Sequence, residues 1–281
     1  MKRFSEILMV LAFVMGVSAL QSCSNLEDDA VKDETVSKTE VSDYVDLIGA
    51  FTLSDVDEAL STDASGNLAD ELKSSESRCF TITIHPNEDG TFWPRSWTLD
   101  FGDGSCECAC GHTRSGMIHV NLSNWWKKDG SLREMAFENF NFDGNKLEGV
   151  KTILNTGLND AGHMTFLKKL VDGKITYADS TSMTWNCEKT AELVEGGSSF
   201  LFFDDVWSVT GNGSGVNIDG KKFTVTITDP LIYKNGCFYP VSGVLTIETE
   251  GEDTKTIDYG DGKCDNKITV TVGDVTEEIE L

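Results

Sequence analysis

The 281-residue sequence is poor in basic side chains. It contains 23 lysine and arginine residues against 47 aspartate and glutamate residues, which gives a formal net charge of −24 at pH 7. Nucleic acids and anionic lipid headgroups repel that much negative charge, so the composition argues against both as partners. Such an acidic composition suits a solvated extracellular surface and leaves cation binding open.

Catalytic motifs are missing as well. The sequence has no Gly-x-Ser-x-Gly, no His-Glu-x-x-His and no glycine-rich phosphate loop. The four histidines stand in no recognised motif, and no glycosidase-type pair can be singled out among 47 carboxylates. We therefore predict a non-catalytic protein, with a surface enzyme acting on polysaccharide as the alternative.

The N-terminus has the pattern of a bacterial lipoprotein leader. Two basic residues precede an apolar core at Ile7–Ala19, which is too short for a stable spanning helix, and Leu20-Gln21-Ser22-Cys23 matches a lipobox. We predict a signal peptide at residues 1–22 and a lipid on Cys23. Its acyl chains, palmitate among them, would anchor the protein in a membrane.

An acidic tether is expected to follow the lipid, over residues 23–77. Glu27, Asp28 and Asp29 stand just after the cysteine, which resembles the surface-export signal of Bacteroidota lipoproteins and predicts the outer membrane, facing the cell exterior. Most of the tether has too few apolar side chains to offset its ordering entropy. Within it, the apolar spacing of Asp43–Leu60 predicts a short helical segment.

From residue 78 to residue 281 the apolar period becomes two, which indicates strands buried on one face. The alternating runs are Phe80–Ile84, Met117–Leu122, Phe223–Thr228, Val244–Glu248 and Ile268–Val272. Only four prolines occur against 26 glycines, and turn signals separate the runs. They are Asp89-Gly90, Asp129-Gly130, Asp143-Gly144, Asp172-Gly173, Asp219-Gly220, Glu250-Gly251 and Gly273-Asp274. The fold class predicted is all-β: an antiparallel meander of about ten to twelve strands, arranged as a rolled sheet, a barrel or a sandwich.

Four of the eight cysteines belong to an internal repeat. Cys106 follows Cys79 by 27 residues, and Cys264 follows Cys237 by 27 residues. Both segments carry an Asp-aromatic-Gly-Asp-Gly motif 21 residues after the first cysteine. This agreement indicates one hairpin unit used twice, at residues 79–106 and 237–264.

The hairpin geometry predicts disulfides. If the second unit turns at residues 250–253, Cys237 falls nearly opposite Cys264, where Cβ atoms lie roughly 4.5–5.5 Å apart. An exported location permits oxidation. We predict a Cys237–Cys264 bond, with Cys79 joined to Cys106 or a neighbour.

Two metal sites are alternatives to plainer explanations. Cys106, Cys108, Cys110 and His112 alternate along the chain, so on a strand all four would share one face and could ligate zinc or copper. Further disulfides, with Cys187 as a partner, are preferred because such close spacing rarely closes a tetrahedral shell. Calcium at the Gly-Asp-Gly turns is likewise secondary to Asp oxygens that accept local backbone amides.

Six tryptophans raise the question of a carbohydrate platform. Trp93 lies near a predicted hairpin tip, and Trp125 and Trp126 are adjacent, so on a strand only one of that pair could enter a core. These three are the candidate ligand-contact aromatics, although half-buried packing is the default for each. Trp185 and Trp207 stand in strand-like runs and are predicted to be core.

Several segments after Cys79, covering about 200 residues, resemble a family of uncharacterised Bacteroidota cell-surface lipoproteins. They are Phe137–Phe140, Lys146–Thr152, Asn155–Gly162, Thr184–Asn186 and, the most specific, Tyr259-Gly260-Asp261-Gly262-Lys263-Cys264-Asp265-Asn266-Lys267. The resemblance implies export and lipidation, and it carries no activity to any residue. Cys108, Cys110 and Cys187 depart from the family pattern, which leaves their pairing open. The function predicted is a surface-exposed, non-catalytic binding or structural module that contacts a glycan or a surface protein.

Overall fold

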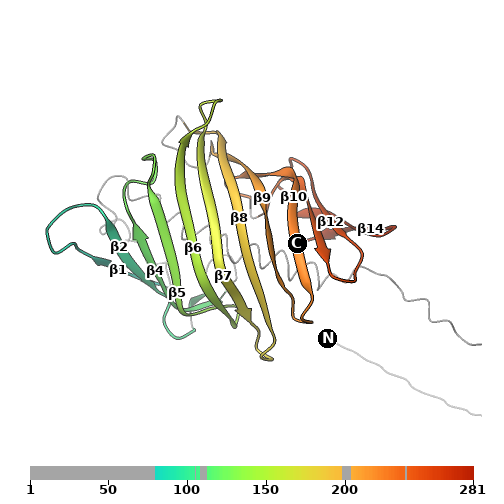
Figure 1. Ribbon diagram of the computed structural model, residues 1–281, viewed down its shortest axis with the longest axis horizontal. Helices are drawn as coiled ribbons and strands as arrows, with labels where there is room; N and C mark the ends of the chain where they lie inside the picture. The colour runs from blue at the N-terminus through green and yellow to red at the C-terminus, as the bar shows by residue number, and fades with distance from the viewer. Residues whose placement is uncertain (1–79, 105, 108–112, 198–203, 238) are drawn as a thin grey trace, which may run out of the picture. The chain divides into compact units, whose positions relative to one another are not determined.

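The computed structural model describes residues 80–281 except 105, 108–112, 198–203 and 238, and this part of the chain forms one antiparallel sheet (Figure 1). The predicted signal peptide, Cys23 and the tether with its helical segment lie outside the described residues. So do Cys79, Cys108, Cys110 and His112. In the described part, no helix has the length and apolar character needed to cross a membrane.

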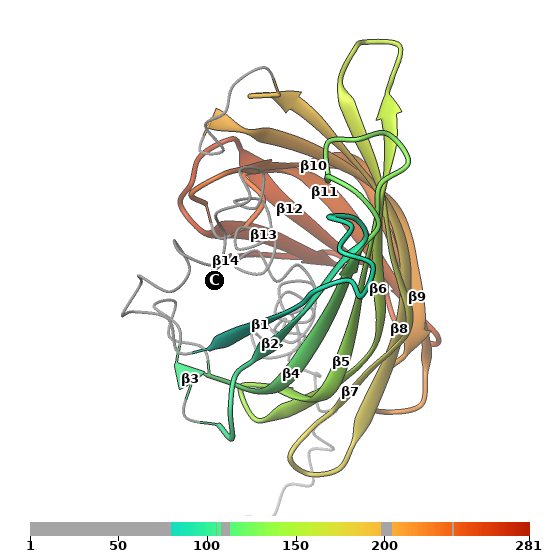
Figure 2. The same ribbon diagram turned by 90° about the vertical axis from the view of Figure 1, so that its left-hand side faces the viewer.

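The sheet contains 14 strands, against the ten to twelve expected, and confirms the predicted all-β meander. Their bounds are β1 (Thr81–His85), β2 (Arg95–Asp100), β3 (Cys106–Glu107), β4 (Thr113–Leu122), β5 (Leu132–Phe142), β6 (Asn145–Leu158), β7 (Met164–Thr176), β8 (Ser182–Glu195), β9 (Val206–Val216), β10 (Lys222–Lys234), β11 (Ser242–Thr249), β12 (Lys255–Asp261), β13 (Lys267–Val272) and β14 (Val275–Glu280). The hydrogen-bonded order follows the chain from β1 to β14, except that the two-residue β3 leaves the path and pairs with β4. The sheet curves, so that its first and last strands lie on the same side of the middle strands (Figure 2).

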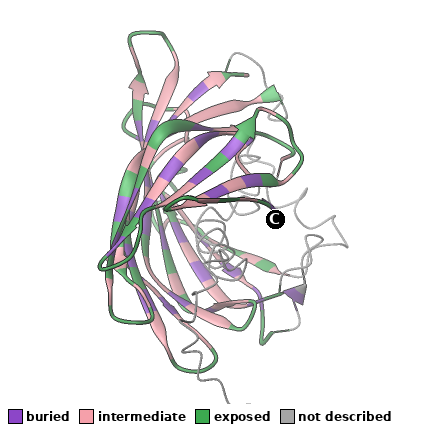
Figure 3. Cartoon of the chain, turned by 90° about the vertical axis from the view of Figure 1, so that its right-hand side faces the viewer, coloured by how far each residue is buried: buried purple, intermediate pink, exposed green. Residues whose placement is uncertain are grey.

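Alternation of apolar and polar residues gives the sheet one buried face and one exposed face, as Figure 3 shows along the strands. Trp97, Ile118 and Leu245 are at most 1% exposed, and buried side chains from β2 to β14 form one continuous cluster. Trp185 is fully within this cluster, and Trp207 packs against it, as predicted. The period-two pattern therefore decides which side chains leave water.

Most of the predicted turns join strands, and Asp143-Gly144 shows why. It links β5 to β6 with φ values of +49° and +78°, the backbone of the two-residue turn that Asp-Gly favours.

The turn predicted at Asp172-Gly173 was wrong. These residues lie inside β7, where the register against β8 shifts between Leu170 and Gly173 and Asp172 has a φ of +52°. They form a β-bulge instead, because residue types that adopt a positive φ in turns also suit bulges. Gly149 in β6 faces it, since a Cβ there would lie 2.9 Å from the Cα of Gly173.

The β9 strand has three glycines on the buried face, Gly211, Gly213 and Gly215. They leave the space that two large rings occupy: Trp185 of β8 and Phe223 of β10 have centroids 5.3 Å apart. Strand β9 thus forms although glycine disfavours strands, because side chains of β8 and β10 fill the space beside its glycines.

The cysteine repeat corresponds to two similar hairpins, β1–β2 and β11–β12. In each, the Asp of the Asp-aromatic-Gly-Asp-Gly motif accepts a backbone amide two residues on, at 2.9 Å from Gly102 to Asp100 and at 2.8 Å from Gly260 to Asp258. The following aromatic residue is buried in both. Asp100 and Asp258 therefore hold the backbone of the turn.

Oxidised cysteines accompany both hairpins. The predicted Cys237–Cys264 disulfide is present, with Cα atoms 5.5 Å apart. Cys106 is also disulfide-bonded. The expectation that Cys187 is a further disulfide partner was wrong: it is a half-buried free thiol.

Candidate ligand-binding site

The exposed face carries a continuous polar row to which every strand except β3 contributes one cross-strand partner. Its members, in strand order, are His85, Ser96, Asn121, Glu134, Thr152, Lys169, Glu188, Asn212, Thr226, Thr246, Thr256, Thr271 and Thr276. None of these side chains is buried. Within the row, Lys169 and Glu188 form an ion pair of 2.8 Å, and the hydroxyls of Thr271 and Thr276 lie 3.0 Å apart.

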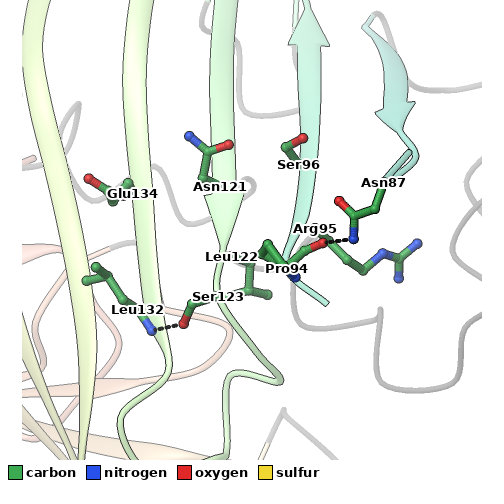
Figure 4. A pocket seen from close by; sticks show the side chains of 9 residues that line it. All are labelled: Asn87, Pro94, Arg95, Ser96, Asn121, Leu122, Ser123, Leu132 and Glu134. Carbon is green, nitrogen blue, oxygen red and sulfur yellow. Dashed lines mark hydrogen bonds between the residues drawn. The ribbon is translucent and has the colours of Figure 1, made fainter. Parts of the chain in front are cut away.

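A cleft of about 250 Å³ lies where this row crosses β2, β4 and β5 (Figure 4). Ser96, Asn121 and Glu134 line it side by side, because they are register partners on adjacent strands. The remaining lining residues are Asn87, Pro94, Arg95, Leu122, Ser123 and Leu132. The volume lies below the roughly 300–1,000 Å³ of sites that enclose a drug-sized ligand, so the cleft suits one small unit of a longer ligand.

Local hydrogen bonds fix the walls of the cleft. The side-chain amide of Asn87 donates to the backbone carbonyls of Pro94 and Thr91, at 2.6 and 2.9 Å, and these bonds close the β1–β2 loop. The Leu132 amide donates to the Ser123 hydroxyl at 2.9 Å, which holds the ends of β4 and β5 together. The cleft is therefore formed before any ligand arrives, which lowers the ordering cost of binding.

The polar side chains at the centre of the cleft are available to a ligand. No hydrogen bond joins the side chains of Ser96, Asn121 or Glu134 to another described residue. Together they offer a hydroxyl, an amide and a carboxylate, which are both donors and acceptors.

An exposed aromatic ring, which does not itself line the cleft, contacts one of the lining residues. Phe92 is 54% exposed, its ring packs edge-on against Trp93 at 5.2 Å, and the guanidinium of the lining residue Arg95 lies 4.6 Å from its centroid. Of the predicted aromatics, Trp93 is thus near the cleft, but it is half-buried against the core. The exposed ring belongs to the neighbouring Phe92. The sequence analysis did not single out Phe92, because its position near the hairpin tip was the only signal for it.

Trp125 and Trp126 are not on a strand but in the loop between β4 and β5. Trp126 stacks on Phe166 with centroids 5.8 Å apart, and the buried Nε1 of Trp125 has no hydrogen-bond partner among the described residues. Neither residue lines the cleft.

A second polar chain crosses the same strands on the exposed face. The Thr98 hydroxyl lies 2.9 Å from His85 Nε2 and 3.1 Å from His119 Nδ1, and His119 Nε2 lies 2.6 Å from Glu138 Oε2. Carboxylate, imidazole and hydroxyl in series are the parts of a nucleophilic triad. However, Thr98 lies in the middle of β2, which is paired with a strand on each side. The nearby backbone amides are therefore hydrogen-bonded within the sheet and are not available to stabilise an oxyanion.

Among the described residues, no group of three or more histidine, cysteine, aspartate or glutamate side chains is placed to hold a metal ion. Three of the four predicted metal ligands, Cys108, Cys110 and His112, lie outside that part of the chain. The zinc or copper site therefore stays a prediction.

A partly exposed histidine–carboxylate pair joins the β6–β7 hairpin to β8. His163 Nδ1 lies 2.7 Å from Glu192 Oε1, and the Asn159 amide donates to the same oxygen at 2.8 Å. The hydrogen bond from His163, then that from Asn159, lowers the pKa of Glu192 below its ordinary value of 4.5. This contact ties the hairpin to β8.

Replacing Glu192 with glutamine is expected to lower the free energy of unfolding by about 0.5 kcal/mol near neutral pH, a small effect because both partners are partly exposed. Since the folded-state pKa is lowered, the stabilisation is present above about pH 4.5 and is lost as the pH falls through the folded-state pKa. Urea unfolding at neutral and acid pH measures the difference. Glu195→Gln at the exposed end of β8 is the control, and a difference that persists at acid pH would contradict the assignment.

Comparison with known proteins yields no match: no family model, no curated protein and no solved structure matches the chain.

Proposed function

We propose that this chain is a lipid-anchored, cell-surface, non-catalytic binding module whose cleft takes a neutral sugar unit of a glycan. The leader at residues 1–22, the lipobox cysteine Cys23 and the acidic residues after it support anchoring in the outer membrane, facing outward. The net charge of −24 disfavours polyanionic glycans.

The observation that carries the sugar proposal is the convergence of Ser96, Asn121 and Glu134 in one cleft. The exposed ring of Phe92 contacts Arg95, another residue that lines the cleft. A sugar presents hydroxyls that both donate and accept, together with apolar C–H faces. A cleft that offers a hydroxyl, an amide and a carboxylate suits the hydroxyls, and the apolar Leu122 and Leu132 that also line it suit the C–H faces.

The same lining disfavours glycoside hydrolysis. Hydrolases of this type use two carboxyl groups about 5–9.5 Å apart, one of them as acid. Glu134 is the single carboxylate among the nine residues that line the cleft. A surface enzyme acting on polysaccharide remains the alternative function, and release of reducing ends from a bound oligosaccharide would favour it.

The test uses the full chain with Cys23→Ser, which removes the lipid attachment point, on an array of neutral and acidic oligosaccharides followed by calorimetric titration. We expect binding of neutral glycans, weakened about tenfold or more (roughly 1.4 kcal/mol) by Asn121→Ala and by Phe92→Ala. Thr246→Ala, in the same polar row but away from the cleft, is the matched control. Absence of glycan binding, with a surface protein captured instead, would replace the sugar proposal by the protein-binding one.

A further inference from the structure

Two of the four histidines meet on the exposed face of β1, β2 and β4, and neither lines the sugar cleft. Thr98 of β2 pairs in register with His119 of β4, and His85 of β1 pairs with Ser96, two residues before Thr98. His85 Nε2 and His119 Nδ1 lie 2.9 and 3.1 Å from the same oxygen, the hydroxyl of Thr98. One imidazole nitrogen from each outer strand therefore points at one atom of the strand between them.

A carboxylate sets the protonation of the His119 ring. Glu138 Oε2 lies 2.6 Å from His119 Nε2, and an ionised carboxylate only accepts hydrogen bonds. In the neutral ring Nε2 therefore carries the proton, and the lone pair of Nδ1 faces Thr98. Histidines that bind metals show the same arrangement, because a second-nitrogen contact to a carboxylate orients the ring and makes the ligating nitrogen more basic.

His85 supplies the second nitrogen. Its ring is exposed to water, so the proton of the neutral ring exchanges between the two nitrogens, and a metal ion selects the form with the lone pair on Nε2. The side chain of His119 is 40% exposed. Both rings therefore have room to turn until their nitrogens reach the roughly 2.0–2.1 Å of a metal–imidazole bond. The backbone beneath them is held by strand pairing on both sides of β2.

The charge and the donor atoms at this position favour one class of cation. Glu138 places a negative charge beside His119, and the net charge of −24 attracts cations to the surface. Imidazole suits zinc, copper and nickel, whereas calcium and magnesium take oxygen ligands. At a given set of nitrogen ligands, copper(II) binds more tightly than zinc or nickel. The donors therefore select a divalent transition metal.

We propose that His85 Nε2 and His119 Nδ1 together bind a divalent transition metal ion, with copper(II) preferred. The Thr98 hydroxyl lies between the two nitrogens, and Glu138 is a positioning residue that acts through His119. Two protein nitrogens leave the other coordination positions to water, so this is an open site rather than a closed structural centre with four protein ligands.

Calorimetric titration with copper(II) chloride tests the proposal. The protein is the full chain with Cys23→Ser and Cys187→Ala, the second change removing the described free thiol, which copper(II) would oxidise. We expect His85→Ala and His119→Ala each to weaken copper binding about tenfold or more. Both side chains are at the surface, so both variants are expected to fold, which far-ultraviolet circular dichroism checks. No copper binding, or loss of affinity in only one of the two variants, would overturn the proposal.

A matched histidine serves as the control. His163 also contacts a carboxylate, Glu192, but it lies between β6 and β7, away from β1 and β2. We expect His163→Ala to leave copper affinity unchanged, and an equal loss in this variant would contradict the assignment. Glu138→Gln is expected to weaken binding about tenfold, the smaller effect typical of a group that orients a ligand. An unchanged affinity would remove Glu138 from the site.

Pulsed electron paramagnetic resonance of the copper-loaded protein counts the ligands. We expect two coordinated imidazoles in the parent chain and one in the His85→Ala or His119→Ala variant. A single imidazole in the parent, or thiolate ligation, would overturn the proposal. Glycan binding is measured separately, so a chain that binds copper and no sugar would keep this site and lose only the sugar proposal.

Discussion

Removing the Cys237–Cys264 disulfide, by replacing both cysteines with alanine, is expected to lower the free energy of unfolding by roughly 3–4 kcal/mol. The bond closes a loop of 27 residues, and in the chain-entropy model the lost cross-link returns conformational freedom to the unfolded chain. The loop holds the β11–β12 hairpin, so the native contacts of that hairpin are left without the constraint that joins its two ends.

Urea unfolding of the wild type and the double variant under non-reducing conditions measures the effect. Cys187→Ala is the control, because this cysteine is free and half-buried, and a change of about 1 kcal/mol or less is expected there. Coinciding unfolding curves for the wild type and the double variant would show that the bond does not constrain the unfolded chain.

Replacing Gly215 with alanine is expected to destabilise the protein by about 3 kcal/mol or more, near the upper end of what overpacking costs. A Cβ at this position collides with the carbonyl oxygen of Thr184 in β8 and would lie 2.8 Å from the Phe223 ring. The Thr184 oxygen is backbone and cannot rotate away, so β8 and β9 must separate or Phe223 must leave its packed position beside Trp185.

Thermal and urea unfolding of Gly215→Ala test this, with near-ultraviolet circular dichroism as a report on the packing of Trp185. Ser214→Ala, one residue earlier and on the exposed face, is the control and is expected to change stability by less than about 0.5 kcal/mol. If Gly215→Ala were as stable as Ser214→Ala, the close approach of β9 to its neighbours would be refuted.

Much of the fold is predictable from side-chain period alone. Runs such as Phe223–Thr228 and Ile268–Val272 fall within β10 and β13, and the cysteine spacing correctly predicts the Cys237–Cys264 bond. The prediction fails where tertiary contacts decide. No alternating apolar run identifies the second half of β9, because its buried face there consists of Gly211, Gly213 and Gly215, beside which the rings of Trp185 and Phe223 pack. At Asp172-Gly173 one local conformation serves both a turn and a bulge, and only the pairing with β8 distinguishes them.

The candidate site was less predictable than the fold. Ser96, Asn121 and Glu134 are common polar residues far apart in sequence, and only the register of β2, β4 and β5 makes them neighbours. Trp93 correctly pointed to the hairpin tip, but whether it or Phe92 faces solvent depends on packing against the core.

The strand order has a consequence for how the molecule folds. Because nearly every strand pairs with the one next to it in sequence, the formation of each pair closes only a short loop, at small entropic cost. The sheet can therefore nucleate at any one hairpin and grow strand by strand in either direction, because the pairing follows the order of the strands in the sequence. Cys237 and Cys264 belong to such a local unit, so their correct pairing does not depend on completion of the rest of the sheet.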